Sequence, residues 1–120
     1  MKYTQSHEWI QIEGDIGVVG ITKYAQQELG EIVHVELPHV GQEIDVGDEV
    51  AVLESTKAAA DIYSPVSGKV LSVNQKIKDD LELINKSPES VGWLFKIKLE
   101  DHRELEILYD EKQYMELVSS

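Results

Sequence analysis

The chain has 120 residues, which is the size of a single domain. Hydrophobic residues make up 42% of it and charged residues 28%, a composition typical of a globular protein with a real core rather than of a disordered chain. The 23 acidic and 11 basic residues give a formal net charge of −12, which disfavours nucleic acid and anionic membranes as partners and favours proteins with basic surfaces.

Three further features of the sequence exclude whole classes of protein. The sequence has no cysteine, so disulfides, thiolate nucleophiles and zinc–thiolate sites are ruled out. The four histidines show no metal-binding spacing, and no metal site is expected. The N-terminus is polar and no apolar run reaches 18 residues, so neither a signal peptide nor a membrane-spanning helix is expected. We therefore expect a cytoplasmic protein, or a processed organellar one.

The first thirty residues predict a β-hairpin followed by a short helix. Residues 8–12 and 16–21 have the alternating and β-branched patterns of two strands, separated by a Gly-Asp turn. Thr22 is suited to cap a helix over residues 23–29, and Gly30 follows where a left-handed residue is favoured.

Short strands separated by turns are predicted from there to residue 99. Residues 32–37, 50–53, 69–73 and 93–99 have strand patterns, and many short strands of this kind indicate a sandwich or a barrel. Residues 46–53 also match residues 77–84, apolar for apolar and acidic for acidic. This internal repeat predicts two similar β-halves related by a pseudo-twofold axis.

The last twenty residues change to a helical pattern. Residues 103–108 and 111–118 have apolar positions at helical spacing, and Asp110 is suited to cap the second helix. The predicted organisation is a single domain over residues 1–120, with a β-core over about 3–99 and C-terminal helices over about 101–118.

The segment from Glu54 to Gly68 stands apart from the other turns and allows two interpretations. Ser55 or Thr56 could cap a short helix through the three alanines that follow Lys57. Alternatively, Lys57 lies at the tip of a hairpin between residues 50–53 and 59–63, where its small neighbours leave the ammonium group in water and open to a modifying enzyme.

The residues around Lys57 resemble the lipoylation site of lipoyl domains. Glu54 lies three positions before the lysine, Ala58 follows it, Asp61 lies four positions after it, and Ser64-Pro65-Val66-Ser67-Gly68 comes downstream. The rest of the chain resembles the H proteins of the glycine cleavage system. The matching pieces are Tyr3-Thr4, Ser6-His7-Glu8-Trp9, Val19-Gly20-Ile21-Thr22, Tyr24-Ala25-Gln26, Leu29-Gly30-Glu31-Ile32-Val33, Val35-Glu36-Leu37-Pro38, Val40-Gly41, Gly92-Trp93, Lys96-Ile97 and Glu104-Leu105.

This resemblance implies a mainly β fold, a barrel-sandwich hybrid, with lipoic acid amide-linked to Lys57 and no catalytic activity of its own. The arm of such a carrier takes the aminomethyl group of glycine between glycine decarboxylase, aminomethyltransferase and dihydrolipoamide dehydrogenase, after lipoate-attaching enzymes have modified the lysine. Glu54 and Asp61 are implied to act in recognition around that lysine. Ser6, Glu8 and Asp61 are implied to line a cleft for the arm, whereas the residues alone would favour simple strand-surface acids at Glu8 and Asp61.

Alternative functions remain open at this point. Thr56, Lys69 and Glu89-Ser90 differ from the family pattern, which leaves open a relay protein that supplies lipoyl groups to 2-oxoacid dehydrogenase complexes. A biotin carrier is disfavoured because Thr56 and Ala58, rather than methionines, flank Lys57. A Schiff-base enzyme is disfavoured because the nearby acids Glu54 and Asp61 would raise the pKa of the lysine. A purely structural adaptor would not need Lys57 at all.

Overall fold

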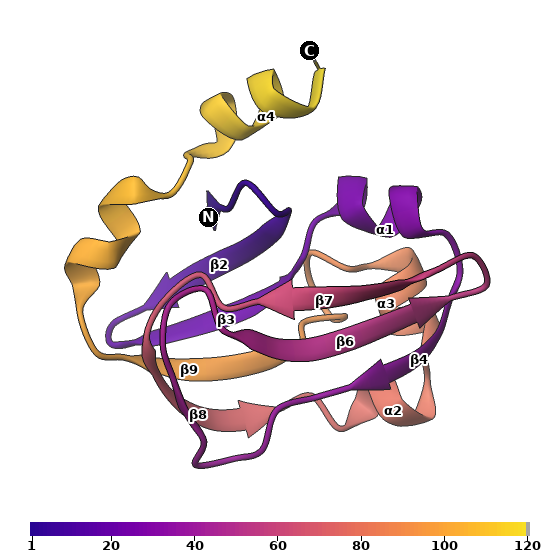
Figure 1. Cartoon of the computed structure of the whole chain (residues 1–120), viewed down its shortest axis with the longest axis horizontal. Coiled ribbons are helices and arrows are strands. Elements are labelled where there is room, and N and C mark those ends of the chain that lie inside the picture. Colours follow the sequence, from indigo (N-terminus) through magenta and orange to yellow (C-terminus); the bar gives the residue numbers. More distant parts are fainter. Residues whose placement is uncertain (120) are drawn as a thin grey trace.

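The computed structural model describes residues 1–119, which form two antiparallel sheets with short helices around them (Figure 1). The larger sheet has the strand order β1-β2-β3-β9-β8-β5, and the smaller has the order β4-β6-β7. The strands are β1 (Lys2–Tyr3), β2 (Glu8–Glu13), β3 (Ile16–Ile21), β4 (Ile32–Glu36), β5 (Glu43–Ile44), β6 (Glu49–Ser55), β7 (Ala59–Tyr63), β8 (Gly68–Val73) and β9 (Phe95–Leu99). The helices are α1 (Lys23–Leu29), α2 (Lys76–Asp79), α3 (Glu82–Lys86), the 3-10 helix η1 (His102–Ile107) and α4 (Glu111–Ser119).

The predicted opening hairpin and the first helix are confirmed. Strands β2 and β3 pair from Glu8 opposite Ile21 to Glu13 opposite Ile16, and Gly14 in the turn has a φ of 62° that suits glycine. Helix α1 begins after Thr22, whose hydroxyl accepts a hydrogen bond from the Ala25 amide at 3.1 Å, and it ends at Gly30 with a φ of 90°.

One hydrophobic core lies between the two sheets. The larger sheet contributes Ile10 and Phe95 and the smaller contributes Ile32 and Leu53, and all four are at most 1% exposed. The alternation of buried and exposed residues in β6 and β7 follows from this arrangement, because one face of the small sheet covers the core and the other faces water. The mainly β fold class predicted from the sequence is confirmed, and the two sheets do not close into a barrel.

The predicted internal repeat is wrong. Residues 46–53 form a turn and most of strand β6, whereas residues 77–84 lie in the short helices α2 and α3. Ile77, Leu81 and Ile84 are spaced by four and three residues, which is helical spacing, and the two isoleucines are fully buried against the core. An apolar-for-apolar match between two segments therefore did not mean the same backbone period, and these two segments are not equivalent β-units.

The C-terminal region is helical, as predicted, with two differences in detail. Residues 102–107 form a 3-10 helix, and the last strand begins at Phe95 rather than at Trp93. Helix α4 is preceded by Asp110, whose carboxylate accepts a hydrogen bond from the Gln113 amide at 2.8 Å, which confirms the predicted cap. Among residues 1–119, no helix combines the length and the apolar character needed to cross a membrane.

Candidate functional site

Lys57 lies in the bend that joins β6 to β7, and its side chain is exposed. The two strands pair from Glu49 opposite Tyr63 to Glu54 opposite Ala59, so the lysine is at the tip of a long hairpin. Figure 1 shows this tip extending beyond the strands on the side of the molecule that carries α1. The hairpin interpretation of this segment is therefore confirmed, and the helical one is wrong.

Ser55 closes the tip of the hairpin. Its hydroxyl accepts hydrogen bonds from the amides of Lys57 and Ala58, both at 3.0 Å, and its own amide donates to the Ala58 carbonyl at 2.7 Å. A serine that satisfies amides two and three positions ahead stabilises a turn in place of a helix cap. The sequence pattern indicated only a helix-capping role for Ser55, because the same local hydrogen bonds begin both structures.

The segment that follows α1 supports the tip from one side. The Thr56 amide donates to the Glu31 carbonyl at 3.2 Å, which ties the bend to the segment after α1. The Lys57 side chain runs over Gly30, where an added Cβ would lie 3.0 Å from Cε and 3.6 Å from Nζ. Gly30 therefore ends the helix and also leaves space for the lysine, which lies along this surface instead of standing alone in water.

Several acidic side chains lie on the outer face of the hairpin. Glu54 and Asp61 are both exposed on the face of the small sheet that points away from the core, and their strand register makes them diagonal neighbours. Glu36 lies on the same face, opposite Val52 of the central strand, and together with Glu49 and Asp61 it lines a shallow hollow there. The lysine tip thus projects from a strongly negative sheet.

Glu8 is the most deeply buried acidic side chain of the described residues, at 1% exposure. Its Oε1 accepts hydrogen bonds from the Thr4 hydroxyl at 2.5 Å and the Ser6 hydroxyl at 2.6 Å, and its Oε2 accepts one from the Tyr63 amide at 3.3 Å. The Thr4 hydroxyl also accepts from the Glu8 amide at 3.0 Å, so residues 4–8 form a tight loop around the carboxylate. These neutral donors satisfy the carboxylate oxygens without cancelling the charge.

A cavity of about 280 Å³ opens beside this loop. Ser6, Glu8 and Tyr63 are among its lining residues, and the others are Tyr3, Thr4, Gln5, Val46, Gly47, Ser64, Pro65, Ile107, Leu108 and Tyr109. Its wall is mainly apolar, with one carboxylate and a few hydroxyl groups, which is the usual character of a small-ligand site.

The structure brings only some of the expected residues together. Ser6 and Glu8 share a hydrogen bond and a cavity, whereas Asp61 does not line that cavity. Asp61 and Tyr63 do lie on the same outer face of β7, because side chains two residues apart in a strand point the same way. The outer face of β7 therefore links the Lys57 tip at one end with the Glu8 cavity at the other, and Asp61 lies between them.

The downstream segment Ser64–Gly68 has a structural role at the base of the hairpin. The amide and hydroxyl of Ser67 both donate to the Glu104 carboxylate at 2.8 Å, and the Ser67 hydroxyl accepts from the Val46 amide at the same distance. These hydrogen bonds give a structural reason why Ser67 and Glu104, which are far apart in the sequence, both belong to the set of residues that resemble the family. The hydrogen bonds of Thr4, Tyr63 and Glu104 had no local sequence signal.

Together, a two-sheet β fold and a lysine at a hairpin tip define the class of carrier domains that hold a prosthetic group on a lysine. The comparison with known proteins is more specific. The sequence model of the family described as "Glycine cleavage H-protein" matches residues 1–120. This chain therefore belongs to the glycine cleavage H-protein family, and it is a lipoyl carrier of glycine cleavage.

Individual relatives agree over nearly the full length. The glycine cleavage system H protein of Thermotoga maritima is 54% identical over 115 residues, which cover 96% of this chain and 93% of that protein. The glycine cleavage system H protein of Parvibaculum lavamentivorans is 48% identical over 120 residues, which cover 100% and 96% of the two chains. The crystal structure of a glycine cleavage system H protein from Mycobacterium marinum superposes with a TM-score of 0.90 at 34% identity, covering 99% and 96%. These relatives favour neither the lipoate relay nor the biotin carrier.

Proposed function

We propose that Lys57 is the attachment point of the lipoyl group, and that the chain itself is non-catalytic. The observation that supports this proposal is the position of an exposed lysine at the tip of a hairpin, next to three small alanines and with its turn closed by Ser55. When bound, the lipoyl group supplies a dithiol–disulfide pair that can accept a one-carbon unit.

The surroundings of Lys57 fit a long flexible arm. Strand β7 advances by roughly 13 Å from Ala59 to Tyr63, at ~3.3 Å per residue. A lysine lengthened by a lipoyl group has about a dozen bonds of ~1.5 Å beyond its Cα, which is enough to cover this distance. The outer face of β7 and the cavity beyond it together make a track and an end point for such an arm, and we infer that Asp61 lies beside the track.

We further propose that the Glu8 cavity shelters the cargo of the arm. An amine-bearing one-carbon unit is cationic and is lost to water by hydrolysis, so a carrier gains from holding it in a cavity with little water. The Glu8 carboxylate supplies a fixed negative charge in the wall of such a cavity, and Ser6 supplies a hydroxyl. The three donors that hold Glu8 in place keep the charge in position before any cargo arrives.

Replacement of Glu8 by glutamine tests the shelter. The amide keeps the size of the side chain and one carbonyl oxygen for Thr4 and Ser6, but it removes the negative charge. We expect the loaded carrier to release formaldehyde about ten times faster, since hydrogen bonds and contacts to charged groups contribute roughly 1.5–3 kcal/mol. The measurement is the first-order rate of formaldehyde release from carrier that has been loaded by glycine decarboxylase and then separated from it.

A matched control is Glu36→Gln, which removes one acidic charge from the outer face of the small sheet, away from the cavity. This control should release formaldehyde at the rate of the unaltered protein. Equal release rates for the Glu8 and Glu36 variants, with both proteins folded, would rule out a sheltering role for Glu8.

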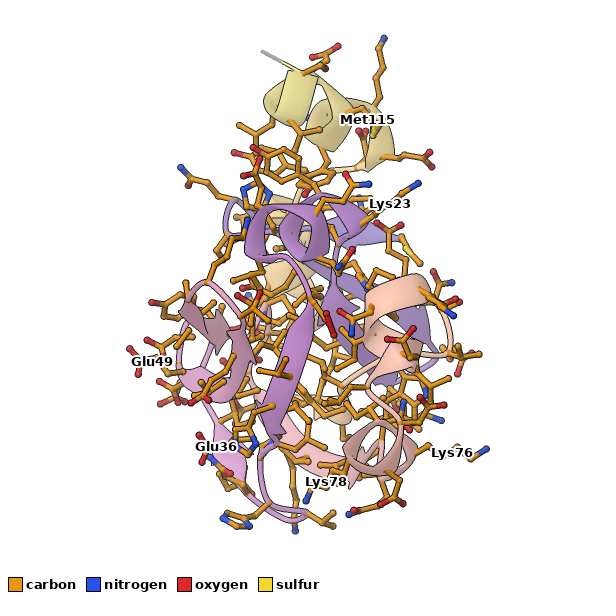
Figure 2. The ribbon with its side chains drawn as sticks, turned by 90° about the vertical axis from the view of Figure 1, so that its right-hand side faces the viewer. Lys23, Glu36, Glu49, Lys76, Lys78 and Met115 are labelled. Carbon is orange, nitrogen blue, oxygen red and sulfur yellow. The ribbon has the colours of Figure 1, made fainter. Side chains whose placement is uncertain are left out.

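The partner enzymes are proposed to approach over the acidic side of the molecule. Residues 24–68 contain nine acidic residues and a single basic one, Lys57, so this segment carries −8 of the net charge of −12. The nine are exposed, and none of them forms an ion pair within the described part of the chain. In Figure 2, Glu36 and Glu49 lie on one side of the molecule and Lys76 on the other. Amide formation at Lys57 removes the one positive charge of the segment.

This charge distribution predicts a strong dependence of partner association on ionic strength. We expect kcat/KM for glycine decarboxylase acting on the lipoylated carrier to fall about tenfold between ~0.02 M and ~0.3 M NaCl, because screening weakens attraction between separated charges. The combined variant Glu36→Gln, Glu49→Gln and Asp61→Asn should flatten this dependence. Neutralisation of three acidic residues in α4 and η1 should leave the salt dependence of kcat/KM unchanged. A kcat/KM that does not change with salt would contradict the proposed approach.

A further inference from the structure

One buried tyrosine of the C-terminal helix connects α4 to two other parts of the chain. Tyr114 is 3% exposed and its ring stacks on Tyr3, with centroids 4.6 Å apart and an interplanar angle of 9°. Its hydroxyl lies 2.8 Å from Nδ1 of His7 and 2.8 Å from the hydroxyl of Thr22. Helix α4 lies to one side of the two sheets (Figure 1), and these two contacts tie it to the loop of residues 4–8 and to the start of α1.

The first of these contacts holds the loop that forms the Glu8 cavity. His7 lies between Ser6 and Glu8 and has a φ of 72°, the one left-handed non-glycine residue of the described chain. Such a conformation costs an ordinary residue roughly 1–2 kcal/mol and persists only where surrounding contacts stabilise it. The His7 ring contacts the Tyr114 hydroxyl and the Tyr24 ring, whose centroid lies 4.7 Å from that of the imidazole. The His7 carbonyl accepts a hydrogen bond from the Thr22 amide at 3.0 Å.

The second contact reaches the helix that supports the lysine tip. The Thr22 hydroxyl caps the start of α1, and Gly30 at the other end of α1 is the surface over which Lys57 lies. Tyr114 therefore touches both the loop at the cavity and the helix at the attachment lysine. No other described side chain forms hydrogen bonds with both.

The hydroxyl of Tyr114 can serve both partners at once. It can donate to Nδ1 of His7 while accepting from Thr22, or accept from a protonated Nδ1 while donating to Thr22, so both protonation states of the imidazole maintain the two hydrogen bonds. Burial raises the pKa of the Tyr114 phenol, with a smaller contribution from the negative charge of Glu89, and the hydrogen bond with Thr22 opposes the rise. The phenol therefore keeps its proton at neutral pH.

We propose that the Tyr114 hydroxyl is a positioning group that holds the loop of residues 4–8 in the conformation that forms the arm cavity. This inference rests on the proposed function of that cavity. The C-terminal helix, which contributes nothing to the attachment tip itself, thereby fixes the position of Glu8 through His7. Loss of the hydroxyl leaves the left-handed His7 with one fewer contact, and the loop relaxes.

Tyr114→Phe removes only the oxygen and keeps the ring that stacks on Tyr3. By hydrogen exchange of the intact carrier without lipoate, we expect the amides of Thr4, which donates to the Glu8 carbonyl, and Thr22 to exchange about tenfold faster. Amides of the β8–β9 ladder should keep their rates. The matched control is Tyr24→Phe, which keeps the ring beside His7 and removes a hydroxyl that makes no hydrogen bond with any of residues 1–119.

Four outcomes are distinguishable. Faster exchange at Thr4 and Thr22 in the Tyr114 variant alone, with faster formaldehyde release from its loaded form, supports the proposal. Unchanged exchange overturns it, and so does faster exchange with no change in release while Glu8→Gln does increase release. If Glu8→Gln also leaves release unchanged, the cavity function fails, and the exchange result still decides whether Tyr114 holds the loop. Tyr114→Leu removes the ring as well as the hydroxyl. We expect this variant to show the same faster exchange at Thr4 and Thr22 and also a lower melting temperature.

Discussion

Replacement of Lys57 by arginine is expected to abolish glycine-dependent activity completely in a system reconstituted with the three partner enzymes. Arginine keeps the charge and much of the length of the side chain, so the hairpin should fold as before. A guanidinium stays protonated in proteins and cannot accept the acyl group that a lysine amine accepts. The measurement is glycine-dependent reduction of nicotinamide cofactor by the reconstituted system, which should fall to the background without carrier.

The control for this result is Lys69→Arg, because Lys69 is also an exposed lysine but lies in strand β8, beyond the end of the hairpin that is far from the tip. This control should retain full activity. Any glycine-dependent turnover by the Lys57 variant above background would mean that the cargo is carried elsewhere, or that the chain acts as an adaptor without an arm.

The second large effect is expected on stability, at Gly68. A Cβ on this residue would lie 2.0 Å from the carbonyl oxygen of Lys98 and 2.9 Å from Cγ1 of Ile97. The first of these atoms belongs to the backbone of the neighbouring strand, so relief of the clash requires β8 and β9 to separate. We expect Gly68→Ala to lower the free energy of unfolding by about 4 kcal/mol, a large part of the ~5–15 kcal/mol that stabilises a typical domain.

Urea denaturation measures this change, and Gly14→Ala provides a control with a different cause. Gly14 has a φ of 62° but no atom within 4 Å of an added Cβ, so only backbone strain of roughly 1–2 kcal/mol is expected there. Equal losses for the two variants would contradict the steric explanation. The close approach of Gly68 to β9 also gives a structural reason why Ser67-Gly68 belongs to the residues that resemble a lipoylation site, although Lys57 lies ten residues or more before the pair. The pair maintains the sheet at the base of the hairpin.

Local features of the structure were predictable where the signal and its consequence lie close together in the sequence. The hairpin over β2 and β3, helix α1 with its cap at Thr22, and the cap at Asp110 all depend on residues that are neighbours in the sequence, at most 13 positions apart for the pair Glu8 and Ile21. The family pattern around Lys57 supplied the choice between a hairpin and a helix, since Ser55 and the alanines suited either one locally.

The remaining features depend on contacts between distant residues. The burial of Glu8 requires the amide of Tyr63, and the position of His7 requires Tyr114, more than a hundred residues later. The match between residues 46–53 and 77–84 predicted a repeat that the structure does not have. Their shared apolar positions are compatible with the two-residue period of a strand and with the period of nearly four residues of a helix. Tertiary packing of Ile77 and Ile84 decided that question in favour of helices.

Attachment of the lipoyl group to Lys57 can be measured by peptide-level mass spectrometry after incubation of the full chain with a lipoate-attaching enzyme and lipoate. We expect a mass increase of one lipoyl group per chain, located by fragmentation on Lys57. A modification on any other lysine, a biotinyl group at Lys57, or an unmodified tip in an otherwise active carrier would contradict this expectation.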